Sequence, residues 1–337
     1  MPSETACHIH GLLAHADADW GPDGLEGRLA FADEMIELAA ASGDAERAYA
    51  GHDCRFIALL ESGELPAARR SHEAGTRLAY QLRQPSQLWD SEVRRAQLAL
   101  FEGRLGEAED AIHEAFAVGH PVQSVNAQLA FDLQMYALRR EQGRIEEVVD
   151  AVERAAEEYP TYPVWRYVVA DVFAELGRAD AARAAVADAA VEGYPVYLEM
   201  QWLFSLNLLA SVCRFLGDAP AADDVYDRLR PYAHRFAVLP PELCFGSVSR
   251  GLGILAATTS RWEDAARHFE DALVANAAAD ARTWLAHTEY DYARMLLERS
   301  GAGDRTRAAE LLASARTSAG ELGMAALAAR LAALARA

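Results

Sequence analysis

The sequence predicts an all-α fold, a superhelical solenoid of about eight helical hairpins that ends in a short capping helix. Three observations support this prediction. A glycine, or once a serine, recurs at intervals of about 40 residues, a spacing typical of stacked supersecondary units. Strong helix formers such as alanine, leucine, arginine and glutamate are abundant, and apolar residues recur every three or four positions. Prolines fall almost wholly between the expected helices, where they suit a connection or a first turn.

The recurring turn residues define the hairpins in chain order. The interval between the fourth and fifth turns is the shortest, so we expect a change of curvature, and a pocket, near that unit. Residues 324–337 form an amphipathic segment that is expected to cap the last apolar face. The whole chain, 1–337, is interpreted as one helical-repeat domain, and no β-strand is predicted. The expected turns lie near Gly21, Gly63, Gly103, Gly143, Gly177, Gly217, Ser260 and Gly301.

The pairing of helices within a hairpin is indicated by small residues at fixed offsets from the turn. In residues 261–273, Ala265, Phe269 and Ala272 fall on one face of a helix. The preceding helix offers Gly253, which would let a neighbouring backbone approach closely.

Composition excludes several classes of function. All 32 basic residues are arginine, so the chain has neither a P-loop lysine for nucleotide phosphates nor a Schiff-base lysine. The formal net charge of −19 would repel nucleic acid, because the arginines are scattered and form no segregated basic patch. The hydrophobic fraction of 52% provides ample apolar surface to bury.

Cysteine usage and the N-terminal segment favour a cytoplasmic protein. Cys7, Cys54, Cys213 and Cys244 are far apart and form no CxxC motif, as expected for reduced, mostly buried thiols. The first residues lack the basic and apolar regions of a signal peptide. No apolar run reaches the roughly 18 residues of a membrane span.

The hairpin pattern resembles the tetratricopeptide repeat, with mostly longer helices. From about Trp20 onward the chain resembles the C-terminal repeat region of large actinobacterial regulators. Those regulators join an AAA-type ATPase to a nucleotide-cyclase domain or to a LuxR-type (MalT-like) DNA-binding domain. The ATPase, cyclase and DNA-binding parts are missing here, so the resemblance implies a right-handed superhelical sensory or scaffolding region. The segments that carry it include RWEDAARHFEDAL, TWLAHTEYDYARMLLERSGAGDRTRAAELL, ELGMAAL, QMYALRREQGR and FSLNLLASVCRFLGD.

The repeat register, borrowed from this family, implies which side chains line the concave surface. Arginines concentrate in the last three units, and we hypothesise that Arg214, Arg250 and Arg294 converge on an anionic peptide or small ligand. Salt bridges between helices are the alternative account of these arginines. The concave-face candidates are Asp90, Gln97, Tyr167, Asp171, Asn207, Ser211, Arg214, Ser247, Arg250, His287, Tyr290 and Arg294, with Asp53 and Arg140 at equivalent positions.

Aromatic residues suggest a second kind of site. Trp202 lies in a segment rich in large side chains near the middle of the array. Packing between units is the default interpretation of this tryptophan, and a pocket for an apolar ligand is the alternative. We therefore add Trp202 to the candidate ligand-binding residues.

Other constellations do not predict a catalytic or metal site. Cys7, His8, His10 and His15 lack the usual spacing of a zinc site, so no metal and no cofactor are predicted. Neighbouring residues such as those of the segment 52–54 diverge on a helix and do not form a catalytic triad.

The leading functional prediction is a regulatory or scaffolding module that binds a protein, a peptide or a small anionic or apolar effector in its concave groove. Neither nucleic acid nor a membrane is expected as a partner, and a homodimer is left open. The alternative is an enzyme or small-molecule-binding protein of specialised metabolism, with Tyr167, Asp171, Asn207 or His287 acting on the substrate. A fragment of a larger regulator is a third interpretation, which the initiator Met1 mildly disfavours.

Overall fold

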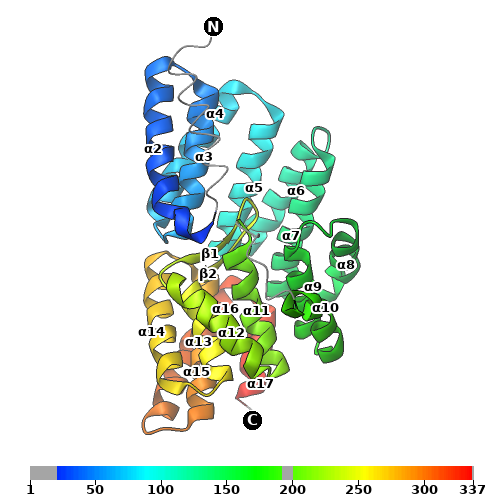
Figure 1. The fold of residues 1–337 in the computed structure, drawn as a ribbon, viewed down its shortest axis with the longest axis vertical. Helices are drawn as coiled ribbons and strands as arrows, with labels where there is room; N and C mark the ends of the chain where they lie inside the picture. Colours follow the sequence, from blue (N-terminus) through cyan, green and yellow to red (C-terminus); the bar gives the residue numbers. More distant parts are fainter. Residues whose placement is uncertain (1–20, 192–199, 336–337) are drawn as a thin grey trace.

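The computed structural model describes residues 21–191 and 200–335 of the chain, and helices dominate both parts (Figure 1). The all-helical prediction is thus confirmed in its main part, since consecutive helices pack against one another along the array. The first part contains η1 (Pro22–Gly24), α2 (Leu25–Ser42), α3 (Ala45–Glu61), α4 (Leu65–Leu82), α5 (Pro85–Glu102), α6 (Leu105–Gly119), α7 (Ser124–Gln142), η2 (Ile145–Val148), α8 (Val149–Glu158), α9 (Val164–Glu175) and α10 (Ala179–Val191).

The second part begins with a helical hairpin and then departs from the helical pattern before returning to it. It contains α11 (Trp202–Leu216), α12 (Ala219–Leu229), η3 (Arg230–Tyr232), β1 (Phe236–Leu239), β2 (Leu243–Ser247), α13 (Val248–Thr258), α14 (Trp262–Ala278), α15 (Arg282–Arg299), α16 (Asp304–Leu322) and α17 (Ala325–Leu334).

The connections between helices lie where the turn residues recur. Five of the predicted turn glycines, Gly63, Gly103, Gly143, Gly177 and Gly217, adopt a positive φ one or two residues after a helix ends, and so does Ser260. The connection after α15 places its left-handed residues at Ser300 and Gly303 instead of Gly301. Gly21 precedes η1, and the helix expected before it falls in residues 1–20, outside the described residues. The capping segment forms α17.

The prediction that the chain has no strand is wrong. β1 and β2 form an antiparallel hairpin in which Phe236 pairs with Ser247 and Val238 with Cys244. Every residue of both strands is buried. A short, fully apolar run has no alternation that would distinguish a buried strand from a helix, and the two prolines between the runs indicated only a gap.

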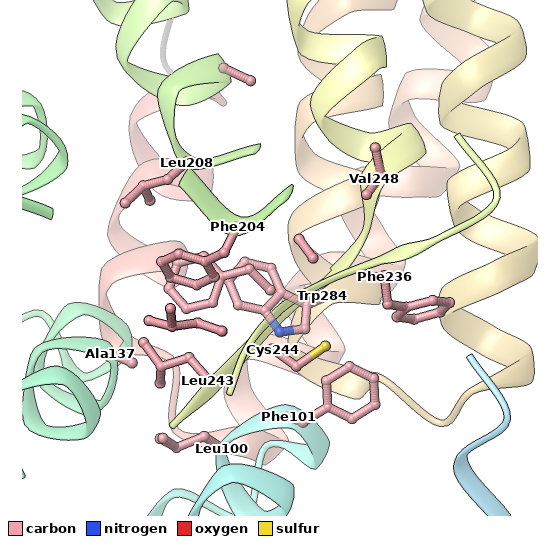
Figure 2. Close-up of a cluster of buried hydrophobic side chains, with 14 of the residues drawn as sticks. Leu100, Phe101, Ala137, Phe204, Leu208, Phe236, Leu243, Cys244, Val248 and Trp284 are labelled. Atoms are coloured by element: carbon pink, nitrogen blue, oxygen red, sulfur yellow. The ribbon is translucent and has the colours of Figure 1, made fainter. Parts of the chain in front are cut away.

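This β-hairpin packs mainly against the first helix of several helical hairpins. β1 contacts α3 and α11, and β2 contacts α5, α7, α11, α13, α14 and α15. Figure 2 shows the apolar cluster around it, where Phe204 and Trp284 approach the strands from α11 and α15. The ring of Phe245 on β2 lies 4.7 Å from that of Phe204 and 4.3 Å from that of Trp284. The strands thus contact several of the helices on which the sequence analysis placed ligand-binding candidates.

The C-terminal helices return to helices of the N-terminal half. α15 contacts α5, and α17 contacts α7. The hydroxyl of Thr283 donates a hydrogen bond of 2.9 Å to the carbonyl oxygen of Leu100, which joins α15 to α5. Repeats of an open solenoid contact only their neighbours in sequence. Here the array curls back on itself around the β-hairpin.

Candidate functional site

A cavity of about 540 Å³ lies where the tip of the β-hairpin meets helices α3, α5 and α7. We call it the acidic pocket. Some of its lining residues are exposed, so the cavity reaches solvent. The lining residues are Asp53, Ile57, Trp89, Asp90, Arg94, Asn126, Leu129, Tyr159, Thr161, Tyr162, Met200, Pro240, Pro241 and Glu242.

Two buried glutamines hold the hairpin tip against the wall of the acidic pocket. The side-chain amide of Gln134 on α7 donates to the carbonyl oxygen of Glu242 at 3.1 Å and to that of Val93 at 2.8 Å. The amide of Gln97 on α5 donates to the carbonyl oxygen of Leu243 at 3.0 Å. Gln97, a predicted site residue, therefore holds the hairpin that forms one wall of the pocket, but it does not line the pocket itself.

One arginine faces the carboxyl groups that α3 and α5 bring to the pocket. Nη2 of Arg94 donates to Oδ2 of Asp53 at 2.6 Å, and the Arg94 side chain is almost fully buried. Burial raises the pKa of the Asp90 carboxyl to about 6, although the charge of Arg94 opposes the shift. Asp90 and Asp53, both named from the repeat register, line this pocket.

Glu242 is the most unusual group in the acidic pocket. The residue is 5% exposed, and its Oε2 atom has no hydrogen-bond partner among the described residues. Burial raises the pKa of this carboxyl to about 8, against a lowering contribution from Arg94. A buried carboxyl without a partner carries a desolvation cost, which a ligand that donates to it would offset.

Apolar and aromatic side chains form the rest of the wall. Ile57, Leu129 and Pro240 contribute aliphatic surface, and Trp89 and Tyr162 contribute aromatic rings. Pockets of this size, mostly apolar with a few convergent polar groups, are typical small-molecule sites. Three carboxyl groups against one guanidinium favour a positively charged ligand group, and aromatic rings add an attraction for a cation.

A second cavity, of about 290 Å³, gathers six of the predicted site residues. Arg214, Arg250 and Arg294 do line the same cavity, although each is also paired with an acid. Arg250 Nη2 lies 2.7 Å from Asp291 Oδ2, and Arg214 and Arg294 share Glu298. The predicted residues in this cavity are Asp171, Ser211, Arg214, Arg250, Tyr290 and Arg294.

The remaining predicted residues are buried outside both cavities. Ser247 caps α13 by accepting from the amide of Ser249 at 3.2 Å. His287 Nε2 lies 2.8 Å from a carboxylate oxygen of Glu141, and burial lowers the pKa of this histidine. The ring of Trp202 makes an edge contact with Tyr232. These buried residues are Gln97, Tyr167, Trp202, Asn207, Ser247 and His287.

Within residues 21–191 and 200–335, no group of three or more His, Cys, Asp or Glu side chains is arranged to hold a metal ion. The N-terminal Cys7, His8, His10 and His15 lie outside the described residues. No described helix is both long and apolar enough to cross a membrane.

Sequence reasoning missed most of the acidic pocket. Glu242 belongs to the hairpin that was not predicted, and Tyr159, Thr161 and Tyr162 lie in the connection between α8 and α9. The signal that was available was the short interval between Gly143 and Gly177, which marks this connection.

The chain matches no protein-family model, and no curated protein matches it either.

Proposed function

We propose that the protein is a small-molecule-binding module whose ligand is an organic cation with an apolar body, held in the acidic pocket. The observation that carries this proposal is the Glu242 carboxyl, which is buried in an apolar wall and lacks a partner at Oε2 among the described residues. An ammonium group that donates to this oxygen would satisfy it and would replace the missing positive charge.

A small ligand is favoured over a long peptide by the position of the β-hairpin. Three predicted groove residues on α5, α11 and α15, namely Gln97, Asn207 and His287, are buried and line neither cavity. A peptide in the concave groove would need the space that β1 and β2 fill. The volume of about 540 Å³ suits a ligand of drug-like size.

The wider role that we propose is regulatory. The array would be a tetratricopeptide-like superhelical solenoid closed around its hairpin, as the resemblance to the sensory regions of regulators suggests. Ligand contact with Glu242 would act on the hairpin tip, and β1 and β2 contact helices of both halves. A cytoplasmic location and a homodimer stay predictions.

Catalysis is a second candidate function, favoured by one observation. Burial raises the pKa of Asp90 to about 6 and that of Glu242 to about 8, and pairs of carboxyls with such separated pKa values serve as acid and base in enzymes. The two candidates differ in a simple assay. A binding module returns a bound amine unchanged after long incubation, whereas an enzyme changes its mass.

The test of the proposed function compares amines with neutral molecules of the same shape. Isothermal titration with tryptamine and its alcohol analogue, and with further aromatic and aliphatic pairs, should show tighter binding of the amine at pH 8.5. Asp90→Asn should weaken the amine by about tenfold, the value of one hydrogen bond to a charged group. Asp227→Asn, at an exposed acid of α12 that lines neither cavity, is the matched control. The proposal fails if no amine in the panel binds more tightly than its neutral partner.

A further inference from the structure

The second cavity, which we call the arginine pocket, collects five guanidinium groups from five helices on a protein of net charge −19. Its lining joins α7, α9, α11, α13, α15 and the capping helix α17. It shares no lining residue with the acidic pocket. The arginines are Arg140, Arg214, Arg250, Arg294 and Arg330.

The acids around these arginines are shared, so donors outnumber acceptors. Glu298 pairs with both Arg214 and Arg294. Glu175 pairs at 3.3 Å with both Arg140 and Arg330. Each guanidinium offers five N–H groups, so a carboxylate that is shared by two guanidinium groups cannot accept from all of their N–H groups.

Arg330 shows the deficit most clearly. Its Nη1 atom donates to Glu175 at 3.3 Å, while its buried Nε and Nη2 atoms have no hydrogen-bond partner among the described residues. Nε and Nη2 form one edge of the guanidinium, and this edge matches the spacing of two oxygens of a carboxylate or phosphate. The guanidinium carbon of Arg330 also lies 5.9 Å from the centre of the Tyr290 ring.

Two further features suit a phosphate group. Ser211 and Tyr290 both line the cavity and carry hydroxyl groups that can donate to an oxyanion. Of the three acids in the lining, Asp171 is occupied, because it accepts hydrogen bonds from Tyr136 at 2.5 Å and from Arg140 at 3.0 Å. Asp291 is likewise held by Arg250 at 2.7 Å.

We infer that the arginine pocket binds the phosphate group of a small phosphorylated ligand or inorganic phosphate, with the Nε and Nη2 edge of Arg330 as its principal donor. Bound there, the phosphate would join the capping helix α17 to α11, α13 and α15. This inference is independent of the cation site in the acidic pocket, and either can fail without the other.

The test measures inorganic phosphate by isothermal titration and by thermal unfolding at constant ionic strength, with sodium chloride as the matched salt. Phosphate should bind and raise the unfolding temperature, and chloride should not. Arg330→Gln should weaken phosphate binding by at least about tenfold, because it removes a charge-assisted bidentate contact. Arg330→Lys should weaken it nearly as much, since lysine keeps the charge but lacks the fork.

Two controls keep the result interpretable. Arg183→Gln removes an exposed arginine of α10 that does not line the cavity and should leave phosphate binding unchanged. Ser211→Ala leaves the capping helix intact and should weaken phosphate by a factor of about three, as expected for one neutral hydrogen bond. Phosphate that binds no better than chloride, or that binds equally to wild type and the folded Arg330→Gln variant, would overturn the inference. Tighter binding of succinate than of phosphate would overturn the phosphate assignment.

Discussion

At the scale of single residues, the partner of a buried carboxyl decides the direction of its pKa shift. Glu141 and Glu242 are both buried. Glu141 contacts His287 and Arg140, and these partners hold its pKa at about 2 against the opposing effect of burial. Burial raises the pKa of Glu242 to about 8, and the lowering effects of a backbone hydrogen bond and of the Arg94 charge do not offset it. Glu141 is therefore stabilised in its ionised form, whereas Glu242 is costly to ionise.

This difference predicts a pH-dependent stability. The usual pKa of a glutamate, about 4.5, applies to Glu242 in the unfolded chain, and the folded value is about 8. The folded protein holds the extra proton between these values, so stability falls as the pH rises from about 4.5 to about 8. Glu242→Gln removes this loss and should raise the free energy of unfolding by about 1–3 kcal/mol at pH 8.5.

Urea unfolding at pH 5 and at pH 8.5 measures the effect. The stabilisation by Glu242→Gln should be small at pH 5, because pH 5 lies only just above the usual glutamate pKa of about 4.5 and little of the loss has accumulated there. Asp227→Asn serves again as the exposed control and should show no such dependence. An equal effect of Glu242→Gln at both pH values would contradict the shifted pKa.

At the scale of elements, β2 is tied to α14 and α15 through one close approach of backbone. Gly246 has φ +71°, and a Cβ placed there would lie 2.5 Å from Cβ of Trp284 and 3.0 Å from the side-chain oxygen of Asn276. The same Asn276 oxygen accepts from the amide of Ser247 at 3.0 Å. Only glycine satisfies both the backbone conformation and the contact.

Gly246→Ala should therefore lower stability by about 3–5 kcal/mol, because strain and a steric clash in the core add. Gly177→Ala is the matched control, since Gly177 has the same φ of +71° and nothing within 4 Å of the added Cβ. The control should cost only about 1 kcal/mol. Equal losses in chemical denaturation of the two variants would show that the packing of β2 against Trp284 is not tight.

The elements also show where sequence reasoning succeeds. Helix boundaries at glycines such as Gly103 and Gly143 follow from local chemistry, because a left-handed residue ends a helix. The strands could not be recognised in the same way. Phe236–Leu239 and Leu243–Ser247 are buried on both faces, so they carry no period-two alternation.

At the scale of the whole molecule, the long-range contacts of the array explain why some predicted residues share a cavity while others are buried. The repeat register selects equivalent positions on the first helix of successive hairpins. Among the residues that it selects, Arg214, Arg250 and Arg294 line one cavity. The register could not foresee that α15 meets α5, or that a hairpin fills the centre. Those contacts join residues far apart in sequence, and no local pattern encodes them.

The β-hairpin also connects the two pockets. The acidic pocket is formed by α3, α5, α7 and the hairpin tip, and the arginine pocket by later helices together with α7 and α17. The hairpin contacts helices that line each of them. We propose above all that the hairpin tip presents Glu242 to a cationic ligand.

The most direct test of this claim is the affinity of the tightest-binding amine, measured between pH 5 and pH 9 for wild type and for Glu242→Gln. Ionised Asp90 and Glu242 attract the cation, with Asp53, Arg94 and Tyr49 as the other titratable groups around them. Wild-type affinity should rise in two steps, near pH 6 and near pH 8, with proton release on binding. Glu242→Gln should lose the step near pH 8 and bind about tenfold more weakly at pH 8.5. A pH profile that is the same for both proteins would contradict the account.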